Sequence, residues 1–240
     1  MRPLSFGLWP LAIAIVLSTA LLTTTYKTIK SDRGTISVKG CAESQIVSDY
    51  VQWQGSIKAT AETQLAAYEK LEADLAEVLS FLESRGITPA AVSIKPIISS
   101  VNYRYTPKGR ATNEIESYVL SQEFAISSSD VPLITSISHE VTTLIKKGLL
   151  LNSNAPQYFY LKIDELKIEM LGQAAKDAKQ RADTILSKGG ANAGTLRSAH
   201  QGVFQITPAF ATYVSDYGEF DTSSIDKRIK AVVTMEFGID

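Results

Sequence analysis

Residues 51–85, VQWQGSIKATAETQLAAYEKLEADLAEVLSFLESR, contain a change of hydrophobic period that decides the fold class. At the start, apolar or small residues take every second position, the period of a half-buried strand: Val51, Trp53, Gly55, Ile57 and Ala59. From Thr60 to Arg85 the apolar residues are three or four apart, so one face of a long helix is apolar. Gly86 is a natural C-terminal stop for this helix. The stretch therefore predicts a strand followed directly by an amphipathic helix.

The same succession of strands and helices is expected downstream. The predicted strands are 91–105, 116–127, 149–151, 157–161, 195–201 and 229–237. The turn-rich TPKGRATNE joins the first two as a long hairpin. Two further helices are predicted, one from the N-cap Asp130 to Gly148 and one from Glu165 to Lys188, capped by Asp164. Strand pairs separated by single helices favour an α+β fold, with three main helices packed on mostly antiparallel sheets.

Upstream of residue 51, the chain divides into an appendage and the start of the domain. Ile36 and Val38 alternate before Gly40 and predict a first strand, which a polar bend ends. Residues 23–34 are polar and small, as in a tether. We therefore expect residues 1–30 to be a membrane anchor or signal with its tether, and residues 31–240 to form one α+β domain.

The segment Leu4–Leu22, LSFGLWPLAIAIVLSTALL, has no charged residue and has the length of a membrane-crossing helix, roughly 17 to 25 residues. It predicts an N-terminal transmembrane helix before the domain. The anchor residues expected to face lipid include Leu4, Trp9, Ile13, Leu17 and Leu22. A cleaved secretory signal is the alternative, because Arg2 precedes the run and Ser18-Thr19-Ala20 resembles a cleavage site. The apolar run continues past Ala20, which favours the uncleaved anchor; cleavage stays open.

The location of the domain follows from two opposing signals. Lys27, Lys30 and Arg33 follow the helix, and such a bias alone would hold the C-terminal side in the cytoplasm. The apolar segment begins at residue 4 and leads a long soluble domain, as export signals do. We expect a single-pass protein of the inner membrane with its domain on the periplasmic side. The alternative is release into the periplasm after signal cleavage.

Composition excludes several classes of function. The 45% hydrophobic and 20% charged residues are typical of a globular chain. With 24 Lys and Arg against 25 Asp and Glu, no excess of positive charge would recruit nucleic acid. The single cysteine, Cys41, excludes an intrachain disulfide framework, and with only His139 and His200 no Cys/His metal cluster can form.

A search for catalytic motifs gives no candidate. No G-x-S-x-G elbow is present, and the glycine cluster at 189–194 follows a helix instead of opening one. Cys41 has no basic cluster beside it and is expected to be a packed or half-exposed small residue. Asp216, Glu219, Asp221 and Asp226 miss the spacing of a calcium loop and are expected to be solvated turn residues. We therefore expect no catalytic residue, no cofactor and no metal, and a protein that is not an enzyme.

One apolar segment lacks a clear period. In residues 202–217, GVFQITPAFATYVSDY, the candidate interface residues are Phe204, Ile206, Phe210 and Tyr213. An apolar connection of this kind either packs on its own domain or is buried by a neighbouring molecule. Both readings stay open from the sequence.

Several segments together resemble the SIMPL-domain family of bacterial extracytoplasmic proteins, over roughly residues 35–240. They include ISVKG at 36–40, Asp49, Tyr103, Tyr105 and Tyr118, and AAKDAKQRA at 174–182, whose A-x-x-D-A-x-x-R-A spacing is the most specific. PQYFYLKIDELKIEML, GVFQITP and DYGEFDTSSIDKRIKAVV resemble one membrane-tethered branch of that family. Ala174, Ala178 and Ala182 lie four apart, so this helix can approach a sheet or another helix closely.

The resemblance implies an α+β domain outside the cytoplasm, with no catalytic residues, a tendency to form homo-oligomers, and links to envelope or oxidative stress. The first hypothesis is therefore a membrane-anchored envelope protein that acts through self-assembly or protein contacts. The alternative is a monomeric extracytoplasmic module that binds a small apolar or peptide ligand between helices and sheet. The sequence names no protein partner.

Overall fold

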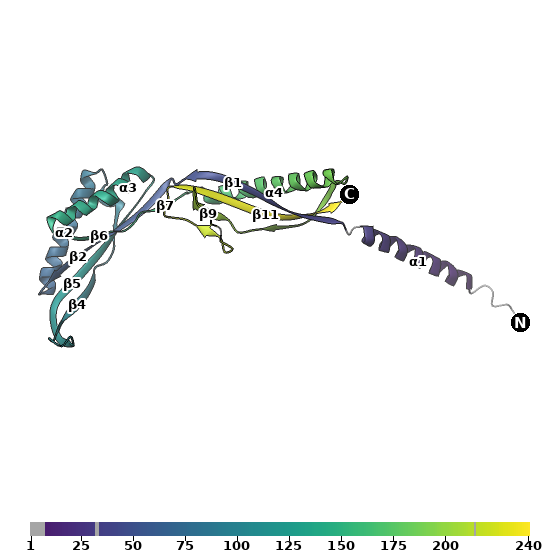
Figure 1. The fold of residues 1–240 in the computed structure, drawn as a ribbon. Coiled ribbons are helices and arrows are strands. Elements are labelled where there is room, and N and C mark those ends of the chain that lie inside the picture. Colours follow the sequence, from purple (N-terminus) through teal and green to yellow (C-terminus); the bar gives the residue numbers. More distant parts are fainter. Residues whose placement is uncertain (1–7, 32–33, 214) are drawn as a thin grey trace.

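The computed structural model describes residues 8–31, 34–213 and 215–240. The helix α1 (Leu8–Ser31) extends away from a body made of two lobes (Figure 1). The base lobe contains β1 (Thr35–Val47), α4 (Ile163–Lys188), β8 (Ala193–Gln201), β9 (Gln205–Pro208), β10 (Glu219–Phe220) and β11 (Asp226–Ile239). The inserted lobe contains β2 (Tyr50–Ala61), α2 (Gln64–Ser84), η2 (Pro89–Ala91), β3 (Val92–Ile94), β4 (Ile98–Tyr105), β5 (Ala111–Ser128), α3 (Val131–Glu140), η3 (Val141–Lys147), β6 (Leu150–Ser153) and β7 (Gln157–Phe159).

The base lobe is a sheet covered on one face by α4. β11 is its central strand and pairs antiparallel with β1, β8 and β9, while β10 pairs parallel with β9. Alternate residues of β1 and β11 point under α4, as the strand period requires. The core therefore joins three groups of buried residues: Val38, Ala42 and Ile46 of β1, Met170, Ala174, Ala178 and Ala182 of α4, and Ile229, Ala231, Val233, Met235 and Phe237 of β11.

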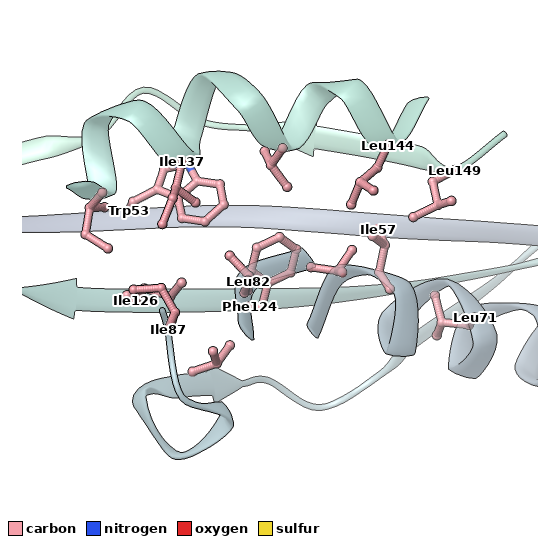
Figure 2. Close-up of a cluster of buried hydrophobic side chains, with 14 of the residues drawn as sticks. Trp53, Ile57, Leu71, Leu82, Ile87, Phe124, Ile126, Ile137, Leu144 and Leu149 are labelled. Atoms are coloured by element: carbon pink, nitrogen blue, oxygen red, sulfur yellow. The ribbon is translucent and has the colours of Figure 1, made fainter. Parts of the chain in front are cut away.

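The inserted lobe has its own sheet and its own core. β5 pairs antiparallel with β2 on one side and with β3 and β4 on the other, and β6 and β7 extend β2. Side chains of α2 and of the α3–η3 helix meet those of β2 and β5 in one cluster (Figure 2). Trp53 packs edge to face on Phe124 and its Nε1 donates to Ser153 Oγ at 3.0 Å.

The expected α+β class with mostly antiparallel sheets is confirmed. Asp130 caps α3 by accepting a hydrogen bond from the Leu133 backbone N–H at 3.0 Å, as expected. The second expected helix changes to a 3-10 helix at Val141 before it ends at Gly148, whose φ is 87°. The predicted strand 91–105 is interrupted and forms β3 and β4.

Two boundaries differ from the expectation. β1 does not bend after Gly40 but runs to Val47, because residues 41–47 pair with β11 and bury Ala42 and Ile46. The third long helix begins at Ile163, so Asp164 lies in its first turn and Lys162 is its N-cap, where no side chain bonds the helix. A carboxylate in the first turn still interacts favourably with the helix dipole.

The N-terminal helix extends beyond the C-terminal end of the apolar run. α1 continues to Ser31, so residues 23–31 of the expected tether are helical, while Leu4 lies outside the described residues. Trp9, Ile13, Leu17 and Leu22 all have exposed side chains. Within the described residues, no helix is both long enough and apolar enough to cross a bilayer.

Three segments form the junction between the lobes. Ser48 N–H donates to Ile225 O at 2.9 Å, and Tyr158 N–H donates to Thr222 O at 2.8 Å. Asp49 Oδ1 accepts from Leu161 N–H at 2.8 Å. Ile225, which precedes β11 of the base lobe, packs against the core of the inserted lobe. The junction is thus built from the β1–β2 link, the β7–α4 link and the loop before β11.

Candidate interface

The apolar segment that the sequence could not assign forms part of the base lobe. β9 pairs antiparallel with β11, and β10 pairs parallel with β9. The loop between β9 and β10 includes the described residues 209–213 and 215–218. Gly218 has φ of 87°, a left-handed conformation that glycine adopts without strain. The Gln205 side chain holds the loop, because its amide nitrogen donates to Ser215 O and its Oε1 accepts from Ser215 N–H at 3.2 Å.

The four candidate interface residues separate into two groups. Ile206 is buried in the base-lobe core, and Phe204 packs against it. Phe210 and Tyr213 are 91% and 53% exposed, and Tyr217 nearby is 97% exposed. β9 therefore packs on its own domain, which is the first of the two sequence readings, and the loop after it leaves its aromatic side chains exposed. Burial of these side chains by a neighbouring molecule stays a prediction. Ile206 is no longer a candidate for a contact with another molecule.

A groove of about 700 Å³ lies between these elements and the start of α4. Val203, Phe204, Tyr217 and Phe220 supply its apolar wall, and Lys167 and Glu219 are among its polar residues. Lys167 is paired with Asp164 at 2.9 Å. Glu219 lines the groove, and Asp216 directly precedes the lining residue Tyr217. Neither carboxylate has an ion-pair partner within the described ranges, so acidic groups lie beside the aromatic side chains.

Asp221 is not the solvated turn residue that the sequence suggested. Its side chain is 7% exposed and pairs with Lys227 Nζ, 2% exposed, at 3.2 Å. Ser223 and Ser224 each donate backbone and hydroxyl hydrogen bonds to the same carboxylate. Burial raises the pKa of Asp221, but these hydrogen bonds outweigh it and hold the pKa well below its usual range. Asp221 therefore fixes the loop before β11 at the junction.

The motif at 174–182 explains how α4 meets β1. A Cβ on Gly40 would lie 2.1 Å from Ala174 O and 2.5 Å from Ala178 N, so only glycine fits under the helix. Asp177 Oδ2 accepts the backbone N–H of Cys41 at 2.8 Å and the Nε–H of Arg181 at 2.8 Å. The Cys41 hydrogen bond holds the pKa of Asp177 below its usual value. These residues dock the helix on the strand.

The remaining polar candidates do not come together. Cys41 is half-buried, as expected, and burial raises the pKa of its thiol, the opposite of an activated nucleophile. His139 is exposed on α3 and His200 is exposed on β8, in different lobes. Across residues 8–31, 34–213 and 215–240, no three His, Cys, Asp or Glu side chains gather where they could hold a metal ion.

The sequence predicted the hairpin of β4 and β5 but not that it projects. β4 is exposed on both faces, apart from half-buried Val101, and so is most of β5 as far as residue 116. The sequence contained only a partial signal, since residues 111–116 of β5, ATNEIE, are too polar for a strand with one buried face. Tyr103 and Tyr105, named above only for a family resemblance, are 45% and 65% exposed.

Comparisons with known proteins give one match of substance. The model of the family SIMPL, described as a protein of unknown function (DUF541), matches residues 36–237. No curated protein matches the chain. Two solved structures are similar at low level. One is described as a putative amidohydrolase/peptidase from Burkholderia cenocepacia, with 16% identity and a TM-score of 0.20; the match covers 52% of this chain and 32% of that one.

The other is an uncharacterized conserved protein from Listeria innocua, with 10% identity and a TM-score of 0.17, covering 82% of this chain and 92% of that one. At TM-scores this low, neither similarity bears on the function of this chain.

Proposed function

This chain belongs to the SIMPL family, and from that premise we propose that it is a membrane-anchored envelope protein that acts by self-assembly and not by catalysis. The observation that carries the proposal is the aromatic loop beside the groove, where Phe210 and Tyr217 are 91% and 97% exposed. Aromatic side chains are enriched in protein interfaces, so exposed aromatic side chains on one loop support a contact surface there.

The membrane part of the proposal rests on α1. Its uncharged residues 8–26 continue the apolar run that starts at Leu4, and α1 extends away from both lobes (Figure 1). We propose that this helix anchors the chain in the inner membrane as in the membrane-tethered branch of the family, with residues 34–240 on the periplasmic side. Release after signal cleavage remains the alternative.

The non-enzymatic part is supported by the separation of the reactive side chains. The two histidines lie in different lobes, and the Cys41 thiol has a raised pKa. Neither arrangement activates a nucleophile, which needs a base within hydrogen-bond reach or a lowered pKa. A link to envelope or oxidative stress is proposed from the family resemblance alone.

The test of self-assembly is the absolute mass of residues 31–240, measured by light scattering after size exclusion over a range of concentrations. A stable multiple of the monomer is expected. Phe210→Ser with Tyr217→Ser should lower that mass, while the matched variant Leu196→Ser, which changes a half-exposed residue on β8, should leave it unchanged. A monomer at every concentration, stabilised against heat by an envelope extract, would instead favour the ligand-binding module.

The location is tested on the full chain in cells. Anchoring predicts that it stays with membranes in alkaline carbonate and keeps its N-terminus, and that protease added to spheroplasts digests residues 34–240. A soluble periplasmic product shortened at Ala20 would identify the segment as a cleaved signal.

A further inference from the structure

The β4–β5 hairpin continues beyond the sheet that supports it. The last paired residue of β2, Ala61, lies opposite Tyr118, while β4 and β5 pair on to Tyr105 and Ala111. Residues 102–105 and 111–117 therefore form a two-stranded ribbon closed by the turn 106–110, and its β4 strand is about 13 Å long at roughly 3.3 Å per residue. It projects from the end of the inserted lobe (Figure 1). A two-stranded ribbon alone is marginally stable, so a contact that covers it would stabilise it.

The ribbon has an apolar face and a basic tip. Tyr103 and Tyr105 lie on one face of β4, in line with the half-buried Val101 where the ribbon leaves the sheet, and Ile115 of β5 is the partner of Tyr103. Tyr103, Tyr105 and Ile115 are 45%, 65% and 44% exposed. At the turn, Lys108 and Arg110 are exposed, and neither has an ion-pair partner within the described ranges.

The groove of the base lobe has the complementary character. Its wall is aromatic and aliphatic, with Val203, Tyr217 and Phe220. Glu219 lines the groove, and the exposed Asp216 directly precedes the lining residue Tyr217. We propose that the ribbon of one copy docks in this groove of a second copy, with Lys108 and Arg110 beside Asp216 and Glu219. This inference rests on the self-assembly proposed above and names the two surfaces that carry it.

Two other surfaces, the edge of β1 and the exposed side of α2, are weaker candidates for binding the ribbon of a second copy. β1 is an edge strand, but the Cys41 N–H that would pair with an added strand already donates to Asp177. The exposed side of α2 is acidic through Glu69 and Glu72, so it could compete for the basic tip. Neither residue lines the groove of the base lobe, so α2 serves as the control.

The contact has a consequence for the form of the assembly. Ribbon and groove are different surfaces, so each copy offers one of each, and the contact is heterologous. Repetition of such a contact gives a ring if the rotation closes and a filament if it does not. Because the contact pairs opposite charges, salt should weaken the association.

The first test reverses the charges in the full chain in detergent micelles. Lys108→Glu with Arg110→Glu, or Asp216→Lys with Glu219→Lys, should each raise the dissociation constant about tenfold or more, because like charges then meet. A chain with all four changes should regain the wild-type mass, a result that misfolding would not produce. The control Glu69→Lys with Glu72→Lys should leave association unchanged.

The second test locates the contact by cross-linking. In a Cys41→Ser background, one tagged copy has Tyr105→Cys and a differently tagged copy has Tyr217→Cys. Mild oxidation should join the two tags, while Tyr105→Cys with Glu72→Cys should give no mixed product. If the wild type assembles but the fourfold variant stays dissociated, or the α2 changes abolish assembly, the ribbon contact is wrong and self-assembly stands. A monomeric wild type overturns both.

Discussion

Gly40 and Ala174 lie at the closest approach of α4 to β1, where a single methyl group decides whether the helix can dock. The alanines four residues apart were expected to permit a close approach, and Ala174, Ala178 and Ala182 are indeed completely buried. Their partner Gly40 was read from the sequence as the end of a strand. Its role as a contact point depends on α4, which begins more than 120 residues later in the chain. No sequence pattern near Gly40 predicts that this helix packs on it.

Gly40→Ala should destabilise the base lobe by about 1–3 kcal/mol, the usual cost of overpacking a core. The new Cβ would meet the backbone atoms Ala174 O and Ala178 N, which cannot rotate away as a side chain can. Urea unfolding followed by circular dichroism measures the change.

The matched control for this prediction is Gly172→Ala on α4. A Cβ there has no atom within 4 Å, and alanine is the better helix former, so we expect a gain of up to about 1 kcal/mol. Equal losses from both substitutions would contradict the close-approach argument.

Asp221 was misjudged from the sequence for a physical reason. In SDYGEFDTSSID the acidic and small polar residues are typical of a solvated turn. In the structure, Ser223, Ser224 and Lys227 surround the Asp221 carboxylate. The loop before β11 is covered there, because Ile225 packs against the core of the inserted lobe. The burial of a charge depends on that distant cover, which the spacing of residues does not encode.

Asp221→Asn should lower the free energy of unfolding at neutral pH by about 3–5 kcal/mol, because it leaves the Lys227 cation buried without its counter-charge. It should also reduce the acid dependence of stability. The folded pKa of Asp221 is below the value of about 3.9 for an ordinary Asp, so its contribution is fully present above that pH and is lost as the pH falls towards the folded pKa.

Unfolding in urea from pH 7 to pH 3 measures both effects. The exposed ion pair of Lys179 and Asp183 supplies the control, because Asp183→Asn should cost less than about 1 kcal/mol. If the wild type and Asp221→Asn lose stability in parallel as the pH falls, the buried carboxylate is not the acid-sensitive group.

At the scale of elements, the hydrophobic periods predicted which helices and strands exist better than how far they extend. α2 and β2 follow directly from the period change at residue 60, since each buries one face in the same lobe. β1 extended past its predicted end because pairing with β11 continues, and α1 extended past the apolar run into polar residues. Pairing and helix continuation are backbone effects, so side-chain periodicity does not reveal them. The projection of the β4–β5 ribbon was not predicted, because its length depends on where β2 ends, and that too is a matter of backbone pairing.

The edge of β1 illustrates how one element protects another. Unpaired N–H groups on an edge strand invite pairing with other chains. Asp177→Ala should free the Cys41 amide and speed its hydrogen exchange by about tenfold or more, since a hydrogen bond to a charged acceptor is lost. Exchange followed by NMR at residue resolution measures this.

Asp183→Ala on the same helix is the matched control, because within the described residues the Asp183 side chain bonds only the exposed Lys179. It should leave the Cys41 amide protected. If Asp177→Ala also leaves exchange at Cys41 unchanged, β11 and α4 alone protect this strand, and the carboxylate has no role at the edge.

The whole molecule is an inserted lobe between two parts of a base lobe, a division that the sequence did not show. The expectation was one domain from residue 31 to 240, with strand pairs alternating with helices throughout. The order of elements is compatible with one sheet or with two, and the pairing partners of the strands decide. β1 pairs with β11, and the strands of residues 50–159 pair with one another in a second sheet. The candidate interface lies in the base lobe and the ribbon in the inserted lobe, so an assembly through both would use the full length of the body.

Because each lobe has its own core, a substitution in one core should destabilise mainly that lobe. Phe124→Ala removes a ring from the inserted lobe and Phe237→Ala removes one from the base lobe; each should cost about 3–5 kcal/mol. Native-state hydrogen exchange should then show faster exchange in β2 and β5 for the first variant and in β1 and β11 for the second.

The hydrogen bonds of Ser48, Asp49 and Tyr158 and the packing of Ile225 couple the two lobes at the junction. We therefore expect amides near the junction to exchange faster in both variants. Uniform acceleration across both sheets would instead mean that the lobes unfold as one cooperative unit, with the junction as strong as either core.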